Sequence, residues 1–126
     1  MLNLNSLLLF SENPKELADF YEKVLDKKPD WVEEGYYGFQ AGSTFLTIGI
    51  HDKVKGKNPQ PERVMINFET SEVKKEFERI KEASGAKVIA EPYEMGGVNM
   101  LIATFEDPDG NYFQLITPFE IDLSKN

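Results

Sequence analysis

One order of elements runs twice along this chain, and this repeat limits the folds open to it more than any other feature. Each half reads as a strand, a helix and three further strands. Between the halves lie residues 51–62, a polar stretch with one glycine and two prolines. A duplicated unit whose helix covers one face of a sheet leaves the other face free. We therefore predict an α+β fold of two tandem βαβββ modules, which form a curved mixed sheet around a cup.

The first half begins with an apolar strand over residues 2–10. Asn13 can cap a helix, and Pro14 suits the first turn, where its missing N–H costs no hydrogen bond. Apolar residues then recur at helical spacing until residues 26–29 end the helix. Three short strand-like runs follow, separated by turns that contain glycine, at residues 31–33, 36–40 and 44–50.

The second half repeats this order. Residues 63–69 read as a strand, with a cap at Thr70 and Ser71, and the helix that follows ends at Gly85. Three strands come next, separated by turns at residues 94–97 and 107–110, and they are predicted over residues 86–93, 98–106 and 112–117. We expect a single domain over residues 1–126, divided into module one at 1–50, the linker at 51–62, module two at 63–118 and a tail at 119–126.

Composition excludes several kinds of site. The chain has no cysteine, so it can form neither a disulfide nor a thiolate metal site. Its 14 basic and 22 acidic residues give a formal net charge of −8. An acidic domain repels phosphate backbones, and we expect no nucleic-acid partner. The apolar run at residues 7–10 is too short for a membrane span, and no basic segment precedes it. We expect a cytoplasmic protein with no membrane partner.

Two motifs resemble those of one known superfamily. Residues 107–115 (DPDGNYFQL) resemble the D-P-x-G-N-x-x-E-L ending of the vicinal oxygen chelate superfamily. That group includes glyoxalase I, extradiol dioxygenases, fosfomycin-resistance enzymes and bleomycin-resistance proteins. The helix at residues 17–25 (LADFYEKVL) is similar to the family's aFYxxvLG helix, with Asp26 where glycine is usual. The resemblance covers nearly the whole chain and agrees with the repeat.

The resemblance also indicates where a metal ion would bind. Metal-dependent members use four side chains that point into the cup, usually two histidines on the first strands and two glutamates on the last strands. The matching positions here are Ser6, Thr47, Met65 and Gln114. Catalytic metal sites need about three anionic or imidazole ligands. Because these four side chains carry no charge, we predict no metal, no other cofactor and no catalytic residue, and Ser6 has no histidine at a spacing that could activate it.

Strand alternation indicates which side chains face the cup. In module one the first strand turns Ser6, Leu8 and Phe10 toward the cup. In module two the first strand turns Met65, Asn67 and Glu69 toward it. The complete set predicted to bind a ligand is Ser6, Leu8, Phe10, Trp31, Tyr37, Phe39, Thr47, Met65, Asn67, Glu69, Tyr112 and Gln114. Two alternatives stay open. Asn67 and Glu69 could instead face solvent or a partner subunit, and the aromatic residues of module one could belong to the core.

Two functions of different classes are compatible with these features. The first is a metal-independent protein resembling bleomycin-resistance proteins, which sequesters a bulky ligand of cationic and aromatic character in the cup. The alternative is a glyoxalase-like metal-dependent lyase or isomerase, or a dioxygenase, and only the fold and Gln114 support it. The resemblance further implies a homodimer, with modules exchanged in some relatives so that each cup uses both subunits.

Overall fold

The computed structural model describes residues 1–95 and 99–119. The elements follow the predicted order, and their bounds are β1 (Ser6–Phe10), α1 (Pro14–Leu25), β2 (Trp31–Glu33), β3 (Tyr36–Ala41), β4 (Thr44–Gly49), η1 (Pro61–Arg63), β5 (Met65–Glu69), α2 (Val73–Ser84), β6 (Lys87–Glu94), β7 (Leu101–Glu106) and β8 (Tyr112–Ile116). The predicted start of a strand at Val98, part of the turn before it and the tail from residue 120 lie outside the described residues. No helix of the described part is long and apolar enough to cross a membrane.

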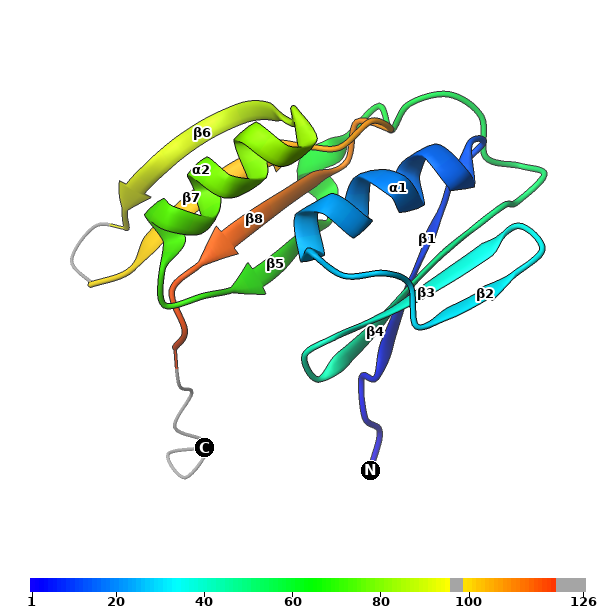
Figure 1. Ribbon diagram of the computed structural model, residues 1–126, viewed down its shortest axis with the longest axis horizontal. Coiled ribbons are helices and arrows are strands. Elements are labelled where there is room, and N and C mark those ends of the chain that lie inside the picture. The colour runs from blue at the N-terminus through cyan, green and yellow to red at the C-terminus, as the bar shows by residue number, and fades with distance from the viewer. Residues whose placement is uncertain (96–98, 120–126) are drawn as a thin grey trace.

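The strands form two mixed sheets of four, with α1 and α2 packed against them (Figure 1). The first sheet has the order β1-β4-β3-β2, and the second has the order β5-β8-β7-β6. In each sheet the first strand of the module runs parallel to the last, and the hairpin strands are antiparallel. This confirms the predicted α+β fold of two βαβββ modules, which we call module one (β1 to β4 with α1) and module two (β5 to β8 with α2).

The two modules repeat each other residue by residue through their first strand and helix. Met65 follows Ser6 by 59 residues, and Val73 follows Pro14 by the same 59. β1 and β5 have five residues each, and α1 and α2 have twelve each. The repeat is thus more regular in backbone length than in residue type.

The helix starts show the same regularity and two corrections. The residue before α2 is Glu72 rather than the predicted Thr70 or Ser71, and its side chain makes no capping hydrogen bond. Asn13 is the residue before α1, as predicted, but its side chain makes no capping hydrogen bond. Its backbone N–H instead donates to the hydroxyl of Ser11 at 2.9 Å. In module two the N–H of Glu72 donates to the hydroxyl of Thr70 at 3.0 Å. Both hydroxyls lie two residues before the residue whose N–H they accept, and they order the turn into the helix.

The core lies between the helices and the sheets. α1 buries Leu17, Ala18, Phe20, Tyr21 and Val24, whereas α2 buries Val73, Phe77 and Ile80. The aromatic rings of Phe77 and Phe105 are stacked at 5.0 Å between centroids, and those of Phe105 and Phe113 at 5.3 Å. Burial of these rings is the main favourable term in the stability of such a core.

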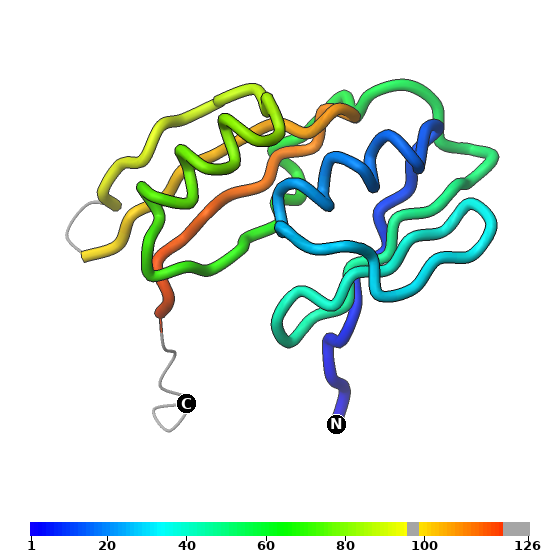
Figure 2. Tube along the Cα trace, viewed as in Figure 1, coloured from blue at the N-terminus to red at the C-terminus, as the bar shows by residue number. Residues whose placement is uncertain are grey.

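The linker joins the two sheets along one end of the molecule (Figure 2). It is held to both modules, because the N–H of Gly56 donates to Glu12 Oε1 at 3.1 Å and that of Asn58 donates to the carbonyl of Asp109 at 2.8 Å. The Asn58 side chain also donates to Asn111 Oδ1 at 3.1 Å. These contacts fix a stretch whose composition alone suggests a flexible connection.

Candidate functional site

Each sheet has one face that neither helix covers, and we call it the open face. In the first sheet Leu46 and Ile48 of β4 belong to the buried core, and Leu7 and Leu9 of β1 pack against it. Strand alternation therefore puts the intervening side chains on the open face. Ser6 and Leu8 lie there, and 58% of the surface of Leu8 is exposed.

The open face of the second sheet has a row of uncharged polar side chains. Asn67 of β5 lies opposite Gln114 of β8, and Gln114 lies opposite Thr104 of β7. The amide nitrogen of Gln114 donates to the hydroxyl of Thr104 at 3.0 Å. Thr104 is buried, so it holds the carboxamide of Gln114 in place while the other amide atom, Oε1, stays available as an acceptor.

The open face of the first sheet is aromatic instead. Trp31 lies opposite Gly38, and Tyr36 lies opposite Gly49. A β-carbon at Gly38 would meet the ring of Phe45 at 2.5 Å, and one at Gly49 would overlap the ring of Tyr36. The rings of Phe45 and Tyr36 thus lie directly against backbone that has no side chain, as glycine in a strand allows.

Ten of the twelve predicted ligand-binding residues lie on strand positions of the open faces, and two do not. Phe39 is fully buried in the hydrophobic core, and Tyr37 packs against that core. Their partners on β4 are Leu46 and Ile48, which face the helices. The prediction that Tyr37 and Phe39 line the cup is therefore wrong in geometry, and the core alternative holds for both. The other ten are Ser6, Leu8, Phe10, Trp31, Thr47, Met65, Asn67, Glu69, Tyr112 and Gln114.

The two open faces are not joined by strand pairing in the described part of one chain. β1 pairs only with β4, and β5 pairs only with β8, so each has an unpaired edge. A groove of about 700 Å³ runs between the modules beside these strands. Apolar residues such as Leu7, Leu46 and Phe68 line it, together with Glu76 and Arg79 of α2.

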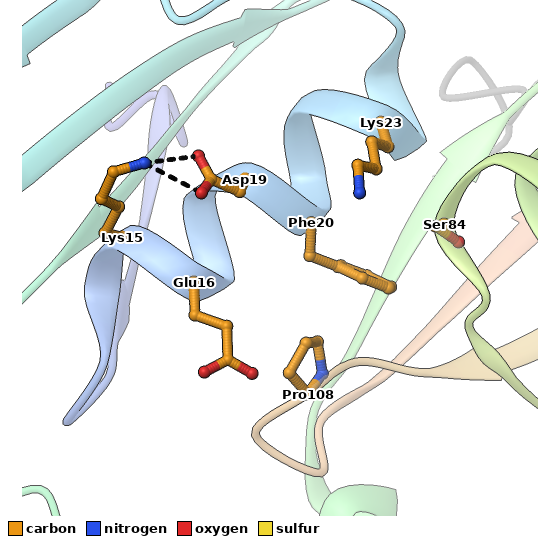
Figure 3. Close-up of a pocket in the computed structure, with 7 residues that line it drawn as sticks. All are labelled: Lys15, Glu16, Asp19, Phe20, Lys23, Ser84 and Pro108. Carbon is orange, nitrogen blue, oxygen red and sulfur yellow. Dashed lines mark hydrogen bonds and ion pairs between the residues drawn. The ribbon is translucent and has the colours of Figure 1, made fainter.

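A second hollow lies away from the open faces, between α1 and the turn before β8 (Figure 3). It has a volume of about 460 Å³, and Phe20 and Pro108 form its apolar part. Lys15 and Asp19, which form an ion pair at 2.9 Å, lie at its rim. Its charged residues are exposed, and an exposed pair of this kind has little energetic weight.

One buried polar contact ties the modules together. The hydroxyl of Tyr21 on α1 donates to Asp107 Oδ2 at 2.7 Å. Burial raises the pKa of the Asp107 carboxyl, although hydrogen bonds from Tyr21 and Asn111 act in the opposite direction. Burial also raises the pKa of Tyr21 well above its ordinary value, and the charge of Asp107 adds to this rise. The pair lies on the helix side of the second sheet, so its role is structural.

The comparisons with known proteins agree with this architecture. The model of the glyoxalase/bleomycin resistance protein/dioxygenase superfamily matches residues 3–115. The chain belongs to that superfamily. No curated protein sequence matches this chain.

Solved structures give the same fold. A protein described only as a conserved domain protein has 25% sequence identity and a TM-score of 0.78, over 94% of this chain and 100% of its own. A superfamily enzyme from Burkholderia phytofirmans PsJN has 20% identity and a TM-score of 0.74, over 94% and 100%. A hypothetical protein from S. aureus has 25% identity and a TM-score of 0.72, over 94% of both chains.

The four positions that the resemblance matches to metal ligands are equivalent in the two modules. In module one Ser6 lies opposite Phe45, and Phe45 is two residues before Thr47. In module two Met65 lies opposite Tyr112, and Tyr112 is two residues before Gln114. The register therefore shows that the two pairs are equivalent between the modules, and their match to the metal positions of relatives stays a prediction. Their donor atoms are two hydroxyls, a thioether and an amide, and this set does not fit a catalytic divalent ion. The described residues also contain no group of three or more histidine or carboxylate side chains placed to hold one.

Two residues that shape the open faces are not singled out by the sequence. Thr104 orients Gln114, and Gly38 supports the ring of Phe45. Tyr36 belongs to the aromatic cluster of module one, for which the sequence leaves a ligand wall and the core as alternatives. Gly38 had a signal in the sequence, because glycine inside a strand often marks a close approach by another group. Thr104 had none, since its importance depends on a strand partner ten residues away.

Proposed function

We propose that this protein binds a bulky aromatic and cationic small molecule without using a metal ion. The observation that supports this most directly is the chemistry of the central positions, where Ser6, Thr47, Met65 and Gln114 offer hydrogen bonds and apolar contact but no charge. Small-molecule sites commonly combine aromatic walls with a few polar groups. The two open faces provide this combination, aromatic in module one and polar in module two.

The charge on these faces favours a cation. Glu69 is exposed at the end of β5, and Glu106 of β7 lies opposite Tyr112. Lys87 lies opposite Glu106 and offsets part of its charge. The whole chain has a formal net charge of −8, which adds a long-range attraction for positive ligands.

We propose that the protein is a homodimer. The edges of β1 and β5 are unpaired in one chain, and apolar side chains are exposed beside them, with exposed fractions of 58% at Leu8, 62% at Val64 and 38% at Met65. An exposed apolar edge strand is normally covered or paired. A second copy that covers these edges would bring two open faces together into one cup. A cytoplasmic location stays a prediction from the sequence.

Two measurements test the proposal. Native mass spectrometry and isothermal titration calorimetry against a panel of cationic compounds, including bleomycin, aminoglycosides and aliphatic polyamines, should give one ligand per cup with a defined affinity. Metal analysis of protein purified without chelators should find no stoichiometric Ni, Zn, Mn or Fe. A stoichiometric metal would instead favour the alternative of a metal-dependent lyase, isomerase or dioxygenase, in which Gln114 would be a ligand.

A further inference from the structure

We infer that the first sheet carries a stacking site for a planar aromatic cation, formed by Trp31, Tyr36 and Phe45 on a floor of Gly38 and Gly49. This inference rests on the proposed function and deepens it, because it assigns one part of the ligand to one module. We call these three aromatic residues the platform.

The absence of side chains at the two glycines is what lets the platform lie against the sheet. A β-carbon at Gly38 would come within 2.5 Å of the Phe45 ring and 3.2 Å of the Trp31 ring. Real β-carbons do not come as close as the first of these distances, so the Phe45 ring occupies space that any other residue would fill, whereas the Trp31 ring is only tightly placed. Gly38 is not among the glycines with positive φ. Its backbone therefore does not require glycine, and the close approach of the rings does.

Gly49 makes the same arrangement for the third ring. A β-carbon there would overlap the Tyr36 ring. The hydroxyl of Tyr36 donates to the carbonyl of Ile50 at 3.4 Å, which holds the ring along the strand. Gly49 also has ordinary strand geometry, since it too is absent from the residues with positive φ. Two neighbouring strands thus use a glycine for the same purpose.

The three aromatic residues are close in the sheet and accessible. Trp31 of β2 lies opposite Gly38 of β3, and Gly38 lies opposite Thr47 of β4. Phe45 precedes Thr47 by two residues and lies on the same face. Trp31 retains 42% exposure, and Tyr36 and Phe45 are half-buried. These partly exposed rings, on neighbouring strands of one open face, offer surface for stacking against another planar ring.

The charge around the platform selects a cation. Glu33 is exposed and lies opposite Tyr36 on the same face. The faces of aromatic rings attract cations through their electron density, and a nearby carboxylate strengthens this attraction. A planar aromatic cation adds stacking on the rings to these two attractions, whereas an aliphatic cation gains only the attraction for its charge.

The chain supplies its own reporter for this site, because Trp31 is its single tryptophan. We would titrate the purified full-length protein with proflavine, a planar aromatic cation, and follow the fluorescence of Trp31 together with the heat of binding. Spermidine serves as the aliphatic cation. We expect saturable quenching by proflavine at one site and no quenching by spermidine.

Gly38→Ala is the decisive variant, because it keeps all three aromatic residues and displaces the ring of Phe45, with at most a small shift at Trp31. The alanine β-carbon meets the far end of the flexible Phe45 side chain, so we expect the ring to swing away and the fold to persist. Proflavine affinity should fall by roughly tenfold or more, as for the loss of a stacking contact. Val32→Ala is the matched control, since Val32 is on the same edge strand but lies opposite Tyr37, on the other face. It should bind proflavine like the wild type.

Each outcome decides between the inference and the proposed function. Unchanged proflavine affinity in Gly38→Ala, while other cations of the panel still bind the wild type, overturns the platform and leaves the proposed function standing. If no compound binds the wild type, both fail. Should Gly38→Ala not fold, Phe45→Leu measured by calorimetry replaces it with the same expected loss. Shielding of Trp31 from acrylamide quenching in the ligand-free protein would show that a second copy covers the platform, and this also overturns the inference.

Discussion

Module one and module two have the same backbone plan but use their helices differently. α1 and α2 have twelve residues each and begin at equivalent positions, yet α1 buries five side chains and α2 buries three. The difference arises where Leu17, Phe20 and Val24 of α1 correspond to residues of α2 that are not buried, which are Glu76, Arg79 and Ala83. Val73, which corresponds to Pro14, offsets one of these losses. Repetition of a unit therefore fixes its internal fold, while a few changed residues decide how the units pack together.

α1 is the element that joins the modules. Phe20 and Tyr21 both contact Phe113 on β8 of module two, with ring centroids 5.8 and 5.6 Å away. α2 packs on its own sheet and reaches module one through Arg79, whose guanidinium donates to carbonyls at the end of α1. The contact that α1 makes with module two is thus apolar and buried, whereas the contact that α2 makes with module one is polar and half-exposed.

The largest expected effect is a difference in stability between alanine substitutions at equivalent strand positions of the two modules. Phe113 and Leu46 both lie on the last strand of their module, opposite Ile66 and Leu7. Phe113→Ala should lower the free energy of unfolding by about 3–5 kcal/mol, because the ring contacts aromatic residues of both modules. Leu46→Ala should cost about 2–3 kcal/mol, at the low end for a leucine, since Leu46 borders the groove where neighbours can relax. Urea denaturation followed by circular dichroism measures both, and equal losses would contradict the bridging role of Phe113.

The next effect concerns the buried hydrogen bond between the modules. Tyr21→Phe removes the donor to Asp107 and keeps the ring, so it should cost about 1–3 kcal/mol at neutral pH. The bond favours the ionised carboxylate, and its loss raises the pKa of Asp107 further. The cost should therefore be greatest above the folded pKa of Asp107 and should shrink as the pH falls through it.

The pH dependence of the difference between variant and wild type checks this assignment. Urea unfolding of both proteins at several pH values gives it directly. Because burial raises the folded pKa of Asp107, the carboxyl also makes folding less favourable as the pH rises through that pKa. A cost of Tyr21→Phe that stays constant from neutral to acid pH would mean that the hydroxyl acts without Asp107.

The repeat, the helix ends and the register of the open faces could be predicted from the sequence, because each depends on local pattern. The assignment of Ser6, Thr47, Met65 and Gln114 as the former metal positions rests on a family resemblance and stays a prediction, although the two pairs are equivalent in the strand register. The error at Tyr37 and Phe39 also has a local cause. Both were chosen for their aromatic rings, whereas the alternation of β3 places Gly38 between them on the open face.

Features that depend on distant contacts could not be predicted in this way. Tyr21 and Asp107 are 86 residues apart, and nothing in either local sequence indicates their hydrogen bond. The groove between the modules is similar, because its lining comes from β1, β4, β5 and α2 together. Sequence patterns specify elements and their faces, whereas the packing of one module on the other follows from shape complementarity of whole surfaces.

A smaller effect sharpens the role of α2 in the module contact. Arg79 Nη2 donates to the carbonyl of Val24 at 2.6 Å, and Nη1 donates to that of Lys23 at 3.1 Å. Arg79→Met keeps the apolar stem and removes these donors, and we expect a loss of about 1 kcal/mol since the side chain is partly exposed. Thermal unfolding with and without added salt measures it. Glu78→Gln, on the same helix but exposed, is the matched control and should leave stability unchanged.

The smallest effect is expected when the residues that end the two helices are exchanged. Asp26 ends α1 with φ of 54°, and Gly85 ends α2 with φ of 66°, so both are left-handed and each donates its N–H back to the helix. A left-handed conformation costs an L-residue such as aspartate about 1 kcal/mol relative to glycine. Asp26→Gly should therefore stabilise the protein by somewhat less than about 1 kcal/mol, because the added flexibility of the unfolded chain offsets part of the gain. Gly85→Asp should destabilise it by a similar amount. If Asp26→Gly instead lowers stability in urea unfolding, the Asp26 side chain contributes an interaction that the helix end of module two lacks, and the two modules differ at this position in energy as well as in sequence.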